Sequence, residues 1–269
     1  MPTGKDVVVP TIQTAQEHVA AYRAAHERLA RLVKDMDEAQ LSAQSYDTEW
    51  SIGHVLSHLG SQAEIFELIL DAVLDGQPSP GGEVFPPVWD RWNARFALAW
   101  RDEYLRASEV HIARLEAIDE ATAASFQMHF FGMDLDLSGF VRLRLFEQAV
   151  HTWDVEVMLD PTATIEPTAV PFLVDHLQRV ASRTGTHHDE RYHVRVGTTR
   201  PTRDFVVTVA DPVTVEIPDP DASYDGAVDL PAEAFVRLVY GRLDPDHAPE
   251  VTESGTRGLA DLRRVFPGV

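Results

Sequence analysis

Cysteine is absent from this chain of 269 residues. Its absence excludes structural disulfides, zinc sites built from thiolates, and a catalytic thiol supplied by the protein itself. Any thiol chemistry would therefore need a thiol from a bound small molecule. The chain does contain 12 histidines, so imidazole and carboxylate groups are the natural ligands for a transition metal.

Basic residues are scarce as well, with 23 Lys and Arg against 43 Asp and Glu, for a formal net charge of −20. Binding to phosphates needs clustered basic residues, which argues against nucleic acid or an anionic membrane as a partner. The sequence also lacks long apolar runs, and residues 1–6 lack the apolar core of a signal peptide. We therefore expect a cytoplasmic protein. No glycine-rich phosphate loop or Gly-x-Ser-x-Gly motif is present.

The first half of the chain has the apolar spacing of amphipathic helices. After a short extended arm, Thr14 and Glu17 form a predicted capping box, while Ser51 and Ser138 are predicted N-caps of later helices. The segment between Asp119 and Asp136 is predicted to be irregular. The predicted helices span residues 14–38, 51–76, 88–118 and 138–159. Four such helices predict a four-helix bundle, a fold that builds metal sites from facing helices.

Four aromatic residues recur at helical spacing in the third of these helices: Trp89, Trp92, Phe96 and Trp100. We expect them to form part of the core; the alternative is that they supply one wall of an apolar pocket.

Beyond residues 161–167, which begin and end with proline, the pattern changes to short β-branched runs. Strands are predicted at residues 192–196, 205–209, 213–217 and 224–230, and helices at 169–183, 231–240 and 257–266. We therefore predict an α+β protein, with a helical domain over residues 1–160 and a small α+β domain over residues 161–269. The helices of the second domain are expected to cover one face of its sheet.

The fourth predicted helix carries Glu147, His151 and Asp154 at i, i+4 and i+7, which places all three on one face. Their neighbours are apolar, so these groups would be partly desolvated and would need partners. One interpretation is that Glu147 and His151 satisfy each other as a hydrogen-bonded pair. The other involves the second helix, where His58 lies on the inward face and His54 one turn before it. A histidine at such a position can also be a satisfied core residue.

Three segments resemble the mycothiol-dependent maleylpyruvate isomerase family, whose N-terminal half is a bundle of the DinB type. They are WSIGHVLSHL at residues 50–59, EQAVHTWD at residues 147–154 and LVYGR at residues 238–242. The resemblance implies a metal ion, zinc or another divalent ion, with His58, Glu147 and His151 as its ligands. Three protein ligands leave positions open, as in catalytic rather than structural zinc sites.

The resemblance further implies mycothiol as a cosubstrate whose thiolate attacks a small electrophile, giving either cis-trans isomerisation or S-conjugation. Asp154 would orient His151, or it would be a surface acid paired with an arginine. Arg242 would bind a substrate or cofactor carboxylate, or it would cap its helix. His54 is not expected to be a ligand, and its role stays open.

Two other functions are compatible with the sequence. A metal-dependent hydrolase would use hydroxide activated by zinc, although no obvious general base accompanies the ligands. A non-catalytic binding module would keep the DinB-like bundle only as a scaffold. The expected partners are a small thiol and a small electrophile, and the chain is compatible with a monomer or a small homo-oligomer.

Overall fold

The computed structural model describes residues 12–268, which form two compact units, one up to Val155 and one from Glu156 onward. The sequence places the domain boundary a few residues later, between residues 160 and 161. The predicted extended arm and the segment 1–6 lie outside the described residues. The combination of a helical N-terminal region and a C-terminal sheet confirms the predicted α+β class.

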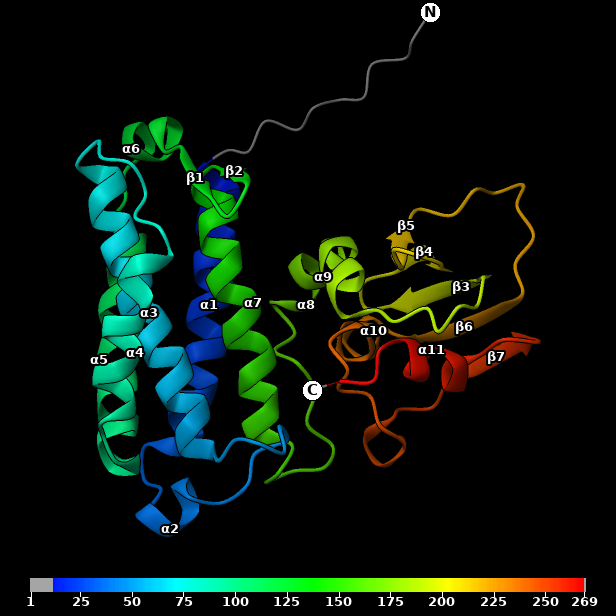
Figure 1. The fold of residues 1–269 in the computed structure, drawn as a ribbon, viewed down its shortest axis with the longest axis horizontal. Helices are drawn as coiled ribbons and strands as arrows, with labels where there is room; N and C mark the ends of the chain where they lie inside the picture. Colours follow the sequence, from blue (N-terminus) through cyan, green and yellow to red (C-terminus); the bar gives the residue numbers. More distant parts are fainter. Residues whose placement is uncertain (1–11, 269) are drawn as a thin grey trace, which may run out of the picture. The chain divides into compact units, whose positions relative to one another are not determined.

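Within the described residues of the first unit, four long helices lie side by side, drawn in blue to green in Figure 1. They are α1 (Ile12–Val33), α3 (Ile52–Leu74), α5 (Ala97–Glu116) and α7 (Leu137–Glu156). Shorter elements join them: α2 (Glu38–Leu41), the 3-10 helix η1 (Gly82–Val84), α4 (Phe85–Asn93), α6 (Glu120–Ser125), and an antiparallel hairpin of β1 (Met128–Phe130) and β2 (Met133–Leu135).

A buried apolar cluster holds the long helices together. Leu29 of α1, Leu56 of α3, Tyr104 of α5 and Val155 of α7 all belong to it and are fully buried. Full burial of one such aliphatic side chain contributes roughly 1.5–3 kcal/mol. This packing brings the inner faces of α3 and α7 together, and these are the helices that carry the candidate metal ligands.

The predicted third helix is wrong as a single element, because residues 94–96 separate α4 from α5. Phe96 adopts an extended conformation as the N-cap of α5, which breaks the helical spacing of the aromatic residues. The predicted aromatic core is therefore wrong in part: Phe96 is 63% exposed and Trp89 42% exposed. Trp92 is buried, and its indole occupies the space that a Cβ at Gly60 would need, 2.1 Å away. Gly60 thus allows α4 to pack closely against α3.

Two predicted caps are also wrong. Thr14 lies inside α1, and Ser138 lies inside α7. Asp136 caps α7 instead, because its Oδ1 accepts a hydrogen bond from the Gly139 N–H at 2.7 Å. Ser138 faces the core, where its Oγ lies 2.9 Å from Nδ1 of His18. The segment predicted to be irregular, residues 119–136, contains α6 and the hairpin. The first helix ends at residue 33 instead of residue 38.

The second unit contains a sheet with strand order β5-β4-β3-β6-β7 in the described residues, in which β3 and β6 are parallel and the other neighbours antiparallel. Its strands are β3 (Tyr192–Thr199), β4 (Arg203–Val209), β5 (Thr214–Glu216), β6 (Gly226–Pro231) and β7 (Thr252–Gly255). Its helices are α8 (Val170–Val174), α9 (Leu177–Thr184), the 3-10 helix η2 (Pro245–His247), α10 (Ala232–Val239) and α11 (Leu259–Val265). Phe235 of α10 packs against Phe205 of β4, with ring centroids 5.3 Å apart.

Two features of this unit differ from the prediction. The helix expected over residues 169–183 is divided into α8 and α9. The edge strand β7 was not predicted, because its residues are polar and exposed and show no apolar alternation.

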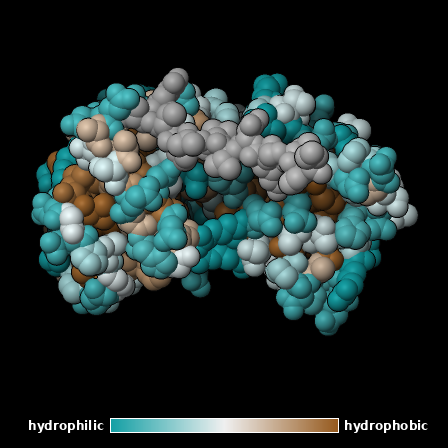
Figure 2. Space-filling model, turned by 90° about the horizontal axis from the view of Figure 1, so that it is seen from above, coloured by the Kyte–Doolittle hydropathy of each residue, from teal (hydrophilic) through white to brown (hydrophobic). Residues whose placement is uncertain are grey.

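Some hydrophobic side chains reach the surface of the described chain, as the brown areas in Figure 2 show for one face. In the first unit they include Phe131, which has a positive φ of 47° and packs edge-on against Phe130 at 4.6 Å. Among residues 12–268, none of the helices combines the length and apolar composition needed to span a bilayer.

Candidate metal centre

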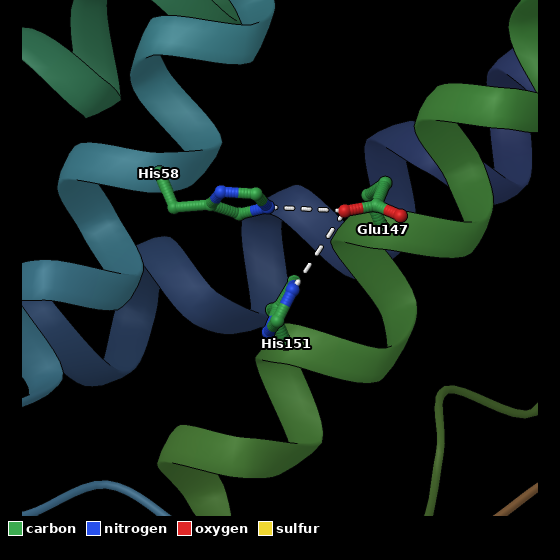
Figure 3. A group of neighbouring side chains, drawn as sticks. All are labelled: His58, Glu147 and His151. Carbon is green, nitrogen blue, oxygen red and sulfur yellow. Dashed lines mark hydrogen bonds and ion pairs between the residues drawn. The ribbon is translucent and has the colours of Figure 1, made fainter. Parts of the chain in front are cut away.

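The N-terminus of α3 fixes the position of the first candidate ligand. Ser51 is the N-cap, as predicted, and its Oγ accepts a hydrogen bond from the His54 N–H at 3.2 Å. Nδ1 of His54 accepts a hydrogen bond from the Ser51 N–H in return, also at 3.2 Å. The exposed His54 side chain therefore caps the helix. One turn further along α3, His58 projects toward α7 (Figure 3).

The structure brings together His58 of α3 and the pair Glu147 and His151 of α7 (Figure 3). One ligand atom from each of these residues lies within 4.8 Å of the other two. Nε2 of His58 is 3.0 Å from Oε2 of Glu147, and Nε2 of His151 is 3.7 Å from the same oxygen. The side chains are 25%, 12% and 40% exposed for His58, His151 and Glu147. The cluster is thus partly buried yet accessible.

Glu147 and His151 do not form a hydrogen bond with each other, although such a bond was one interpretation of the sequence. Their separation of 3.7 Å exceeds a hydrogen-bond distance. Glu147 instead bonds across the helices to His58, and Nδ1 of His151 lies 2.8 Å from Oδ2 of Asp154. Asp154 is fully buried, so its interpretation as a surface acid is wrong. In the neutral tautomer in which Nδ1 donates to this carboxylate, Nε2 carries the lone pair of His151, and this nitrogen faces Glu147.

Trp50 lines the cluster on one side. Its ring is stacked on His151 at 5.8 Å and lies 4.9 Å from the ring of His58. Gln62, one turn after His58, donates from Nε2 to Oε2 of Glu147 at 3.0 Å. Sequence reasoning missed Gln62, although its i+4 spacing from His58 places it on the same face of α3.

The surroundings favour the protonation states that bind metals. Burial lowers the pKa of His58 and outweighs the hydrogen bond to Glu147, which acts in the opposite direction. Burial raises the pKa of Glu147, but the hydrogen bond from His58 and the electrostatic interactions with His151 and His58 together bring it well below its usual range. A neutral imidazole and an ionised carboxylate are the forms that coordinate a metal ion.

These residues fit a catalytic metal site. Two imidazole nitrogens and one carboxylate oxygen form a donor set typical of catalytic zinc, in which further positions stay open. The buried carboxylate behind His151 is the outer partner that such histidines usually have.

The fifth predicted site residue, Arg242, belongs to the second unit and follows α10. It is buried, and its Nη1 donates to the backbone oxygen of Tyr240 at 2.8 Å. Its backbone N–H donates to the oxygen of Arg237 at 2.7 Å. The residue therefore makes contacts typical of a helix C-terminus.

Comparisons with known proteins identify a family and a fold. Residues 22–156 match the model of the family described as mycothiol maleylpyruvate isomerase N-terminal domain. Two solved structures share the fold: the mycothiol-dependent maleylpyruvate isomerase, with a TM-score of 0.65, and its histidine-to-alanine mutant, with a TM-score of 0.66. Each is 15% identical, and the alignments cover 91% of this chain and 96% of the other. No curated protein matches the sequence.

Proposed function

This chain belongs to the mycothiol maleylpyruvate isomerase N-terminal domain family, and we propose that it is a metal-dependent enzyme that uses a small thiol, mycothiol, to isomerise a maleylpyruvate-type substrate. The family match bears out the resemblance seen in the sequence. The observation that carries the proposal is the convergence of His58, Glu147 and His151 from two helices.

These three side chains would hold the metal, and zinc is the ion that their donor set favours. A bound zinc ion would act as a Lewis acid and lower the pKa of a thiol, so that the thiolate is available at neutral pH. Asp154 would hold His151 in the tautomer that leaves Nε2 free. Trp50 would cover one side of both imidazoles and limit the access of water. Since the chain contains no cysteine, the nucleophilic sulfur must come from the cosubstrate.

In the proposed reaction, the thiolate adds to the conjugated double bond and forms a C–S bond, while the π electrons move onto the carbonyl oxygen. The former double bond then rotates as a single bond. Return of the electrons re-forms the double bond in the trans geometry and expels the thiolate, which is regenerated. If the adduct is protonated and released instead, the product is an S-conjugate and the thiol is consumed.

We also propose that Arg242 binds a carboxylate, because a guanidinium binds carboxylates in a bidentate manner. Arg242→Ala tests this role. A binding role predicts a higher KM for the substrate, whereas a purely capping role predicts lower thermal stability with unchanged kinetics.

The experiment that tests the function measures the concentrations of maleylpyruvate and free mycothiol over time in one reaction. It compares the zinc-loaded protein, the metal-free protein and the variant His151→Ala. We expect conversion of maleylpyruvate only with both metal and thiol, without net loss of thiol. Stoichiometric loss of thiol would favour S-conjugation, and conversion without thiol would favour a hydrolase. A zinc-loaded protein that binds neither mycothiol nor maleylpyruvate would refute the proposal and favour a binding module.

A further inference from the structure

Arg144 of α7 is a fully buried arginine without an acidic partner among residues 12–268. Its Nη1 donates to Oε1 of Gln62, and its Nη2 donates to the hydroxyl of Tyr22 at 3.2 Å and to the oxygen of Leu59 at 3.1 Å. Nε is buried and has no hydrogen-bond partner in the part of the chain that the structure describes. The guanidinium also lies over the rings of Tyr22 and Phe66, 5.6 Å and 5.5 Å from their centroids. Neutral acceptors and aromatic faces therefore surround this buried charge, instead of a carboxylate.

The contact with Arg144 determines the orientation of the Gln62 amide. A guanidinium has only donors, so the atom of Gln62 that it contacts must be the oxygen. The amide nitrogen of Gln62 consequently points the other way, toward Oε2 of Glu147 at 3.0 Å and Nε2 of His58 at 2.9 Å. These are two of the atoms that would bind the metal. Arg144, Gln62 and Glu147 thus form one hydrogen-bonded series that ends at the metal centre.

We propose that Gln62, oriented by Arg144, is a positioning residue that holds the carboxylate of Glu147 in place for the metal ion. The inference rests on the proposed function, because it assumes that the three-residue cluster binds a metal. Glu147 is the most exposed of the three ligands, and the N–H of Gln62 restricts the rotation of its carboxylate. Outer partners of this kind typically change metal affinity by roughly 10–100-fold.

The test uses the full-length metal-free protein and measures zinc affinity by competition with a chromophoric chelator. The absorption spectrum of bound Co²⁺ reports the ligand geometry, which a purely structural role would leave unchanged. The variants are Gln62→Met, Arg144→Met and the double variant. Gln62 is partly exposed, so its substitution leaves no large core cavity.

Gln148→Met is the matched control. Gln148 of α7 is also a glutamine, but its Nε2 donates to the hydroxyl of Tyr104 on α5 at 2.9 Å and to Oγ1 of Thr152 at 3.1 Å instead of to a candidate ligand. We expect this variant to keep the zinc affinity and the Co²⁺ spectrum of the wild type.

For Gln62→Met and Arg144→Met we expect about 10-fold weaker zinc binding each, together with an altered Co²⁺ spectrum. The double variant should bind zinc no more weakly than the single variant with the lower zinc affinity, because both residues act in one hydrogen-bonded series. Wild-type affinity and spectrum in Gln62→Met, or additive losses in the double variant, would overturn the inference. If the wild type itself binds no metal, the proposed function fails. If the wild type binds zinc but Gln62→Met binds it equally well, only the positioning role of Gln62 fails.

Discussion

The carboxylate behind His151 offers a quantitative test of the metal centre. Oδ2 of Asp154 is buried and lies 2.8 Å from Nδ1 of His151. A hydrogen bond to a charged group contributes about 1.5–3 kcal/mol, and a neutral one about 0.5–1.5 kcal/mol. Asp154→Asn keeps the shape and an acceptor but removes the charge, so it should cost the metal-bound state about 1–1.5 kcal/mol. Because about 1.4 kcal/mol corresponds to a factor of ten, zinc should bind roughly 5–10-fold more weakly.

The assay is competition for zinc between the metal-free protein and a chelator at neutral pH. Asp136→Asn is the matched control, since Asp136 caps the same helix but contacts none of the candidate ligands. That control should leave zinc affinity unchanged. Equal zinc affinities of Asp154→Asn and the wild type would refute the reasoning, because the buried carboxylate would then have no influence on His151 as a ligand.

Three further predictions concern stability. Burial lowers the pKa of His26 to about 4, from its ordinary value of 6.5, so the unfolded state binds the proton more readily. The free energy of unfolding should therefore fall as the pH decreases from 6.5 toward 4, and this group should account for on the order of 3 kcal/mol of the decrease. Urea titrations of His26→Leu over the same pH range should lack this part of the decrease. Gly60→Ala should lower the free energy of unfolding, measured in urea, by about 1–3 kcal/mol, since the added Cβ would overlap the ring of Trp92. An unchanged urea midpoint would contradict the close packing of α4 against α3. Arg144→Met should unfold at or above the wild-type temperature in the metal-free state, because it removes a buried charge that has no acidic partner among the described residues. A clear loss of thermal stability would show that Arg144 stabilises the fold.

Helical spacing was sufficient to place Glu147, His151 and Asp154 on one face, because all three belong to one uninterrupted helix. The contact of His58 with Glu147 came from the resemblance, since spacing within one helix says nothing about a partner on another. The series from Arg144 through Gln62 could not be predicted for the same reason. It depends on how far α3 and α7 are offset along their axes, which the packing of many core residues determines.

The errors in the fold have a common cause. Periodicity continues through residues 94–96, yet the chain leaves the helix there and Phe96 is extended. Trp92 packs on α3, where its ring fills the space beside Gly60 and its Nε1 donates to Glu64 at 2.8 Å. Such tertiary contacts override local propensity. The edge strand β7 was missed because its pairing with β6 is made by backbone groups of polar residues, which carry no apolar signal.

The most direct test of the central claim is the metal content of the purified protein, measured beside that of His151→Ala, with retention of mycothiol by each. The account predicts about one zinc ion per chain in the wild type, and loss of both the metal and the thiol in the variant, since one of three ligands is removed. A well-folded wild type that takes up no metal, even after incubation with zinc, would contradict the account and leave His58, Glu147 and His151 as polar groups of a non-catalytic bundle.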